Sequence, residues 1–190
     1  MRPALRVLAR EHLALRAVGR ILAMEAEILS TGGRADSDLM TSIVEYLEAF
    51  PNRIHHPKEE SQIFLRMRLR APEKCTTLLG KLLLDHQKET EHIAALIKTL
   101  REYQAGESNG RVRLAELAGS YAKFLDKHID LEDDEAFPLA EKLLTDDDWQ
   151  AVDASFLLND DPLAREHIET GHFDKLHRRI LSLGAPPPGL

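Results

Sequence analysis

The segment from 128 to 138 reads His-Ile-Asp-Leu-Glu-Asp-Asp-Glu-Ala-Phe-Pro, and it decides the fold of the chain. Within it, His128 and Glu132 stand four residues apart, so on a helix both side chains project from the same face, one turn apart. An imidazole beside a carboxylate is half of a binding site for a borderline cation such as iron, manganese or zinc. The segment therefore predicts that the other half of the site lies elsewhere in the chain.

The other half is expected in residues 55 to 64, which read His-His-Pro-Lys-Glu-Glu-Ser-Gln-Ile-Phe. Three residue types recur at a constant offset of 73 positions: His55 matches His128, Glu59 matches Glu132 and Phe64 matches Phe137. A single His-x-x-x-Glu is often an ordinary surface pair worth about 0.2–0.5 kcal/mol. Its recurrence at a constant offset indicates instead that both copies serve one site.

Two acid–histidine pairs extend the repeat. Glu11-His12 and Asp85-His86 lie 74 positions apart, so each half of the chain supplies one histidine and, about 42 residues later, a His-x-x-x-Glu. Four histidines with two bridging glutamates supply terminal nitrogens and bridging oxygens to two iron ions, with positions left open for a small ligand. The acids Glu11 and Asp85 are expected to tune the imidazoles next to them.

Two alternatives stay open at this level. His56 and Glu60 also stand four residues apart, in a register rotated by about 100° around the helix axis from the first pair. Asp133 competes with Glu132 as the carboxylate of the last helix. The constant offset favours His55 over its neighbour, and Glu132 over the aspartate.

Apolar side chains recur at three- and four-residue steps along most of the chain, and no segment of useful length has the period of a strand. This pattern predicts an all-α chain with long amphipathic helices over residues 3–29, about 38–71, 72–105 and about 112–143. Two prolines, at 51 and 57, should kink or interrupt the second helix because each removes a backbone donor. Four long helices joined by short loops pack most readily as an up-down-up-down bundle.

Local signals place the ends of the helices. Gly32-Gly33 is a stop signal after the first helix, and Asp36-Ser37 offers N-caps for the second. Thr145 and the acids after it begin a short fifth helix that extends to about residue 157. A turn at 159–162 precedes a last amphipathic piece.

The chain is therefore expected to form a single domain over residues 1–183. Its bundle core spans 3–143 and its C-terminal extension, with two short additional helices, spans 145–183. The tail from 184 to 190 contains three consecutive prolines and is expected to be disordered.

Composition limits the classes of function. The 190 residues are 43% hydrophobic and 30% charged, and the net charge of −7 comes without a dense Lys/Arg block, so we do not expect a nucleic-acid partner. No run approaches the roughly 18 apolar residues that would cross a membrane. Cys75 is a single cysteine, so no internal disulfide forms. With no apolar signal core after Met1, we expect a cytoplasmic protein.

These pieces, in this order, resemble the hemerythrin-like family, also called the HHE cation-binding domain. The matching pieces are Glu11-His12, His55 to Phe64, Asp85-His86 and His128 to Pro138, and the resemblance covers residues 1 to about 143. It implies a four-helix bundle around a non-haem di-iron centre. It also implies a set of metal ligands, which are His12, His55, Glu59, His86, His128 and Glu132.

One departure from the family pattern bears on function. The oxygen-carrying hemerythrins place two histidines four apart on the third helix, whereas here Thr90 follows His86 at that distance. A fifth histidine has to come from His56 or His92 or is absent, and coordination by Glu89 is also left open. The resemblance therefore implies a metal site more directly than it implies reversible oxygen carriage.

For function, we favour a binding protein over an enzyme. We expect the chain to hold two iron ions and, through them, to bind or sense oxygen or a related small ligand such as NO. The alternative is an enzyme or repair factor that acts on peroxide, nitric oxide or damaged iron–sulfur clusters. A second alternative is a structural bundle whose site holds zinc or no metal, and manganese also suits the ligands. No catalytic residue is assigned, and a homodimer is compatible with the pattern.

Overall fold

The computed structural model describes residues 2–156, 163 and 173–182. Within these residues every regular element is a helix and none is a strand, so the all-α prediction is confirmed. The elements, with η for π-helices, are α1 (Pro3–Ser30), α2 (Ser37–Ala49), η1 (Pro51–His55), α3 (His56–Lys58), η2 (Glu59–Phe64), α4 (Leu65–Arg70), α5 (Pro72–Gln104), α6 (Gly110–Leu131), η3 (Glu132–Ala136), α7 (Phe137–Leu143), α8 (Asp146–Ser155) and α9 (Asp174–Ser182).

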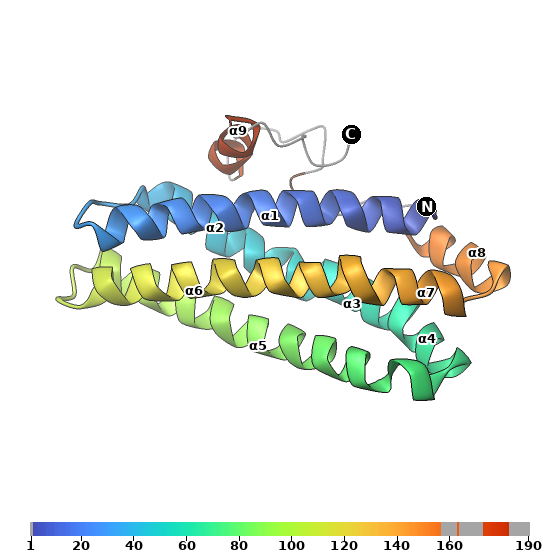
Figure 1. The fold of residues 1–190 in the computed structure, drawn as a ribbon. Coiled ribbons are helices and arrows are strands. Elements are labelled where there is room, and N and C mark those ends of the chain that lie inside the picture. The colour runs from blue at the N-terminus through green and yellow to red at the C-terminus, as the bar shows by residue number, and fades with distance from the viewer. Residues whose placement is uncertain (1, 157–162, 164–172, 183–190) are drawn as a thin grey trace.

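The long helical runs lie side by side and form a bundle. Figure 1 shows α1, the run from α2 to α4, the single helix α5, and the run from α6 to α7 extending along one common direction. Helix α8 lies beyond the end of the bundle where the chain begins, and α9 lies against α1 and α2. Among the described residues, none of the helices is both long and apolar enough to cross a membrane.

The predicted boundary signals act as expected. Gly32 follows α1 with a φ of +92°, a left-handed conformation that glycine adopts without strain. The Asp36 side chain accepts hydrogen bonds from the backbone N–H groups of Asp38 (3.2 Å) and Leu39 (3.1 Å) and so caps α2. Thr145 begins α8 through a reciprocal capping box with the residue three positions later.

The run from α2 to α4 departs from a regular α-helix near its prolines, as predicted. The α-helix ends at Ala49, Phe50 is a turn, and the run continues through two π-helices, η1 and η2, on either side of α3. At the start of η1, the Phe50 carbonyl accepts hydrogen bonds from the N–H groups of both Ile54 (2.9 Å) and His55 (3.1 Å). A π-turn contains an extra residue, so it absorbs a missing proline donor and rotates the following side chains around the axis.

Two apolar clusters fill the core, one toward each end of the bundle. The α9-side cluster is centred on the second half of α1 with α2 and also includes Leu176 and Ile180 of α9. The α8-side cluster surrounds the first turns of α1 and includes Trp149 of α8. Both C-terminal helices thus pack on the bundle, while the predicted turn at 159–162 and the tail at 184–190 lie outside the described residues.

Buried polar side chains separate the two clusters. On α1, Leu8 belongs to the α8-side cluster and Leu15 to the α9-side cluster, and the buried His12 lies between them. The same order occurs on α5 and α6, so the polar residues form one layer across the bundle. We call this the polar layer, and it consists of His12, His55, His56, Glu59, His86, Glu89, His128 and Glu132.

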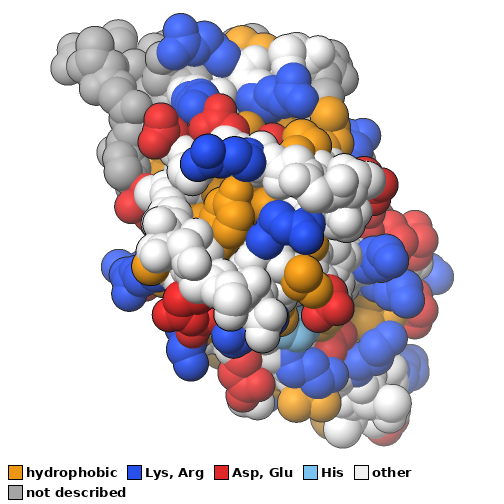
Figure 2. Space-filling model, turned by 90° about the vertical axis from the view of Figure 1, so that its left-hand side faces the viewer, with side chains coloured by type: hydrophobic (Ala, Val, Ile, Leu, Met, Phe, Trp, Pro, Cys, Tyr) orange, Lys and Arg blue, Asp and Glu red, His pale blue; other side chains and the backbone are white. Residues whose placement is uncertain are grey.

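The surface at the end of the bundle away from α8 carries both positive and negative side chains. Figure 2 views the end that carries the turns between α1 and α2 and between α5 and α6, where Lys and Arg side chains alternate with Asp and Glu around a small hydrophobic area. This face therefore carries no extended patch of a single charge.

Candidate metal centre

The structure brings all of the predicted ligand residues into the polar layer, where they form two neighbouring groups. In the first group, four side chains each offer a donor atom, and these atoms lie within 4.8 Å of one another: His12, His55, Glu59 and Glu132. In the second group, three histidines meet by the same criterion: His56, His86 and His128. None of the seven is more than 5% exposed, so water does not compete freely for these atoms.

Glu59 directs one carboxylate oxygen toward each group. Its Oε1 lies 3.5 Å from His55 Nε2 and 3.8 Å from His12 Nε2, both in the first group. Its Oε2 lies 3.8 Å from His86 Nε2, in the second group. A carboxylate placed in this way can bridge two cations.

Glu132, at the start of η3, does the same. Its Oε2 lies 3.3 Å from His12 Nε2, while its Oε1 lies 3.5 Å from His86 Nε2 and 3.4 Å from His128 Nε2. The two glutamates repeat at the constant offset in the sequence, and in space they occupy equivalent positions between the two histidine groups. The arrangement therefore offers two groups of donor atoms that could hold cations, with a carboxylate oxygen of each glutamate available to each group.

The hydrogen-bonding state of these atoms tests whether the residues fit metal ions. Within the described part of the chain, several buried donor atoms have no hydrogen-bond partner: His12 Nε2, both oxygens of Glu59, His86 Nε2, both ring nitrogens of His128 and both oxygens of Glu132. Unpaired buried polar atoms are costly, and cations bound between the two groups would satisfy all of these atoms except His128 Nδ1, because one imidazole offers only one of its nitrogens to the site. Two donors bound to one ion at about 2.1 Å lie about 3 Å apart at a right angle, close to the spacings found here.

Carboxylates outside the layer hold three of the imidazoles in position. His12 Nδ1 donates to Asp133 Oδ1 at 2.8 Å, and His55 Nδ1 donates to Glu11 Oε2 at 2.8 Å. His86 Nδ1 lies 2.6 Å from an oxygen of Glu60. With Nδ1 engaged outward, each ring presents Nε2 to the centre, which is the usual support for metal-binding histidines.

These contacts correct the expectation that each acid tunes the histidine next to it. Glu11 reaches His55 on another helix and not the adjacent His12. Asp85 pairs with Lys88 at 3.0 Å. Neighbours in a helix point about 100° apart, so an acid rarely contacts the residue beside it and more often meets a different helix.

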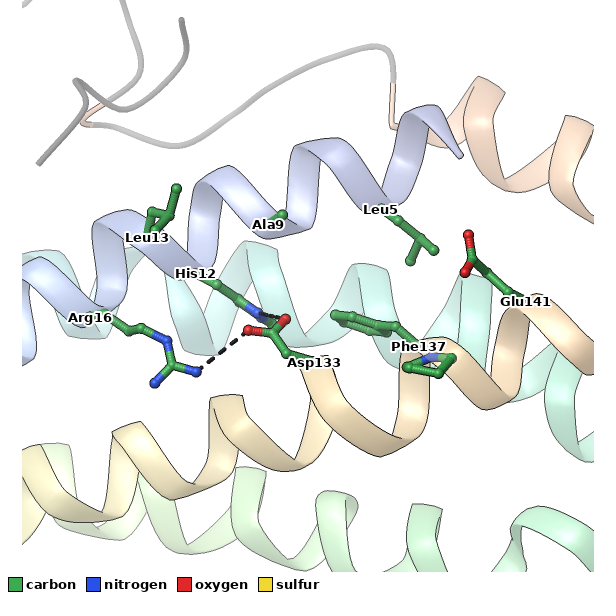
Figure 3. Close-up of a pocket in the computed structure, with 9 residues that line it drawn as sticks. Leu5, Ala9, His12, Leu13, Arg16, Asp133, Phe137 and Glu141 are labelled. Carbon is green, nitrogen blue, oxygen red and sulfur yellow. Dashed lines mark hydrogen bonds and ion pairs between the residues drawn. The ribbon is translucent and has the colours of Figure 1, made fainter. Parts of the chain in front are cut away.

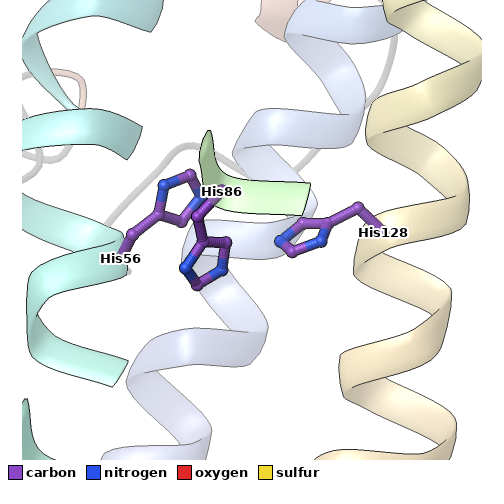
Figure 4. A group of neighbouring side chains, drawn as sticks. All are labelled: His56, His86 and His128. Carbon is purple, nitrogen blue, oxygen red and sulfur yellow. The ribbon is translucent and has the colours of Figure 1, made fainter. Parts of the chain in front are cut away.

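The histidines of the two rival registers, His55 and His56, both lie in the polar layer. His55 lies in the first group and His56 in the second, and the His56 ring stacks on His86 with centroids 3.9 Å apart. Figure 4 shows the three imidazoles of the second group projecting from three separate helical runs into the space between them. His92 instead packs edge-on against Phe124 at 4.9 Å and belongs to neither group.

His56, which the sequence pattern left open as a fifth histidine, therefore lies in the second group. Choosing between adjacent residues assumes an α-helix, in which they face 100° apart. The π-helices before and after α3 change that angle. The prolines at 51 and 57 were the available signal that this segment departs from a regular helix.

Electrostatics divides the imidazoles into two kinds. Burial opposes the charged form of His86, but contacts with Glu132 and Glu60 outweigh it and raise the pKa of His86 to about 10. Burial lowers the pKa of His128 to about 4. Burial and the neighbouring imidazoles also lower the pKa of His56 well below its usual value. Charged and neutral rings thus lie side by side, and a cation that enters must displace the proton on His86.

A groove of about 500 Å³ lies between α1 and α7 and touches the first group. Its lining includes Leu5, His12, Arg16, Asp133 and Phe137. Figure 3 shows the hydrogen bond between the histidine and the aspartate in this groove, with the arginine reaching the same carboxylate. The first group therefore reaches the wall of this groove through His12.

Comparison with known proteins agrees with this geometry. The family model described as Hemerythrin HHE cation binding domain matches residues 4–140, which includes every residue of the polar layer. No curated protein and no solved structure gives a significant match to the chain.

Proposed function

Since the chain belongs to the hemerythrin HHE cation-binding domain family, we propose that it is a non-haem di-iron protein that binds or senses oxygen or a related diatomic ligand such as NO. The family and the buried histidine and glutamate groups fit a metal-binding protein. The identity of the metal and of the small ligand is the further step. The observation that supports a site for two ions is the position of Glu59 and Glu132, each with one oxygen toward each histidine group.

The proposed ligands follow from the two groups. One ion would be held by His12 and His55 and the other by the histidines of the second group, with Glu59 and Glu132 each offering one oxygen to either ion. The proposed scaffold is an up-down-up-down four-helix bundle within one domain over residues 1–183. It is supported by the side-by-side runs in Figure 1 and by the packing of α8 and α9 on them.

Each part of the surroundings has a role in this proposal. The outer carboxylates of Glu11, Glu60 and Asp133 orient the imidazoles. The apolar clusters exclude water on both sides of the polar layer. When bound, two iron ions supply coordination positions that a small diatomic ligand can occupy. The groove beside His12 offers such a ligand a route from the surface.

Elemental analysis together with an aerobic visible spectrum tests the proposal. Protein produced with iron is expected to hold about two iron ions per chain and to show a visible band that depends on oxygen or NO. If that band disappears under vacuum and returns with gas, the protein binds its ligand reversibly. Repeated turnover of peroxide or NO would show an enzyme instead. Zinc as the metal found in cells, or no metal in iron-rich growth, would contradict the di-iron proposal.

A double variant tests the ligand assignment. His128→Ala combined with Glu59→Ala removes a terminal and a bridging ligand, so the metal content is expected to fall well below that of the unmodified protein. The matched control is His92→Ala combined with Glu25→Ala, which removes a half-buried histidine and a buried glutamate outside both groups. Equal metal content in the two double variants would show that the assignment is wrong.

A further inference from the structure

Glu89 is a buried carboxylate of the polar layer for which the dinuclear arrangement above has no use. It lies on α5, three residues after His86, and it is 0% exposed. Its Oε1 accepts a hydrogen bond of 2.6 Å from the hydroxyl of Tyr121 on α6, which is itself 1% exposed. One of its oxygens is therefore held firmly from a second helix.

The other oxygen points at the second histidine group. Glu89 Oε2 lies 3.4 Å from His56 Nε2, and it has no hydrogen-bond partner among the residues that the structure describes. This spacing matches two donors that share an ion, like the spacings of Glu132 to its histidines. A buried carboxylate oxygen without a donor is costly, and a bound cation would remove that cost.

The count of donors leaves a place for this oxygen. Three histidines and two bridging glutamates give the second ion five protein donors, whereas iron and similar ions take about six. The first ion, with two histidines and the same two bridges, has only four.

We propose that Glu89 is an additional ligand of the ion held by His56, His86 and His128, bound through Oε2, and that Tyr121 is its positioning residue. This inference rests on the proposed dinuclear site and deepens it. It fills the sixth position of the second ion with a protein group. A small exogenous ligand then binds at the first ion, on the side of His12 and the groove.

The test uses the full chain loaded with Co²⁺ and azide as the exogenous probe. Glu89→Gln keeps the size of the side chain and removes its charge. The expected result is a Co²⁺ affinity at least about 10-fold weaker at one of the two ions. A second azide is expected to bind per chain, seen as an additional step in a visible titration, because the sixth position of the second ion is now open.

Two matched controls separate this effect from general damage. Glu25→Gln changes another buried glutamate, which accepts a hydrogen bond of 3.0 Å from the backbone N–H of Asp36 far from the layer. It is expected to leave both titrations unchanged. Tyr121→Phe is expected to weaken Co²⁺ binding at the same ion by about 10-fold, whereas Tyr46→Phe, another buried tyrosine, leaves it unchanged.

The outcomes are distinct. Weaker Co²⁺ binding with a second azide in Glu89→Gln supports the inference. Weaker Co²⁺ binding without a second azide overturns it, since Glu89 would then only support the His56 ring. Titrations equal to those of Glu25→Gln also overturn it and leave the proposed dinuclear site intact. If the unmodified protein binds neither Co²⁺ nor iron, the proposed function itself fails.

Discussion

The polar layer and the apolar clusters on either side of it share the same helices but follow opposite rules. Along α1, Leu8 and Leu15 are fully satisfied by packing, whereas His12 between them keeps a buried ring nitrogen without a hydrogen-bond partner in the described structure. The same contrast holds on α6, where Leu125 and the buried His128 differ in this way. The difference teaches that the clusters stabilise the fold, while the layer is arranged for a ligand at the expense of stability.

Of the changes considered, removal of metal is expected to alter the stability of the protein most, because it acts on the polar layer alone. A chelator should lower the melting temperature sharply, because an ion at about 1,000 times its Kd stabilises the folded state by about 4 kcal/mol. Thermal melts of loaded and stripped protein measure the difference. An unchanged melting temperature after the metal has been shown to leave would mean that the layer does not depend on cations.

A cavity in an apolar cluster is expected to lower the free energy of unfolding by nearly as much. The loss should be the same with and without metal. Leu22 is 0% exposed in the α9-side cluster, so Leu22→Ala should destabilise the protein by about 3 kcal/mol. Urea unfolding of loaded and stripped protein checks this. A loss confined to the loaded form would show that the cluster and the layer are not separate.

The stability of the stripped protein and the affinity for metal should change in opposite directions as the pH rises. Because the pKa of His86 is raised to about 10, its ion pairs stabilise the stripped protein fully below about pH 6.5, and this stability is lost as the pH rises toward 10. Metal must displace the same proton, so metal affinity should rise with pH by up to about tenfold per unit. Calorimetric titration between pH 6 and 9 measures this, and an affinity independent of pH would contradict it.

The smallest expected effect is the change in stability of the stripped protein when Glu59 is replaced, and whether it is a gain or a loss is informative. Burial and the nearby charge of Glu132 raise the pKa of Glu59, so the stripped protein holds this carboxylate at a cost. Glu59→Gln should therefore make the stripped protein about 1 kcal/mol more stable while it weakens metal binding. Glu25→Gln, which changes a buried acid with a backbone donor, should not stabilise the protein. A loss of stability in stripped Glu59→Gln would contradict the idea of a layer built for cations.

Much of this contrast could be predicted from the sequence. The helix bounds agree closely, as for α1, expected over 3–29 and found at Pro3–Ser30, because apolar periodicity and caps are local signals. The polar layer was also predictable in outline: the constant offset between His55-x-x-x-Glu59 and His128-x-x-x-Glu132 required two equivalent segments to meet.

Other features depended on contacts between helices. His56 lies in the second group and in α3, between two π-helices, and the hydrogen bonds that make a π-turn are not visible as a residue pattern. Glu11 supports His55 across helices, and Tyr121 holds Glu89 in the same manner.

The sequence by itself thus determined that the chain is helical, where its helices end and which residue types meet in the polar layer, since these follow from periodicity and repetition along the chain. Only the tertiary structure decided which carboxylate supports which histidine and which of two adjacent histidines lies in which group. The physical reason is that these choices depend on the rotation of each helix about its axis and on its neighbours in the bundle, and packing sets both.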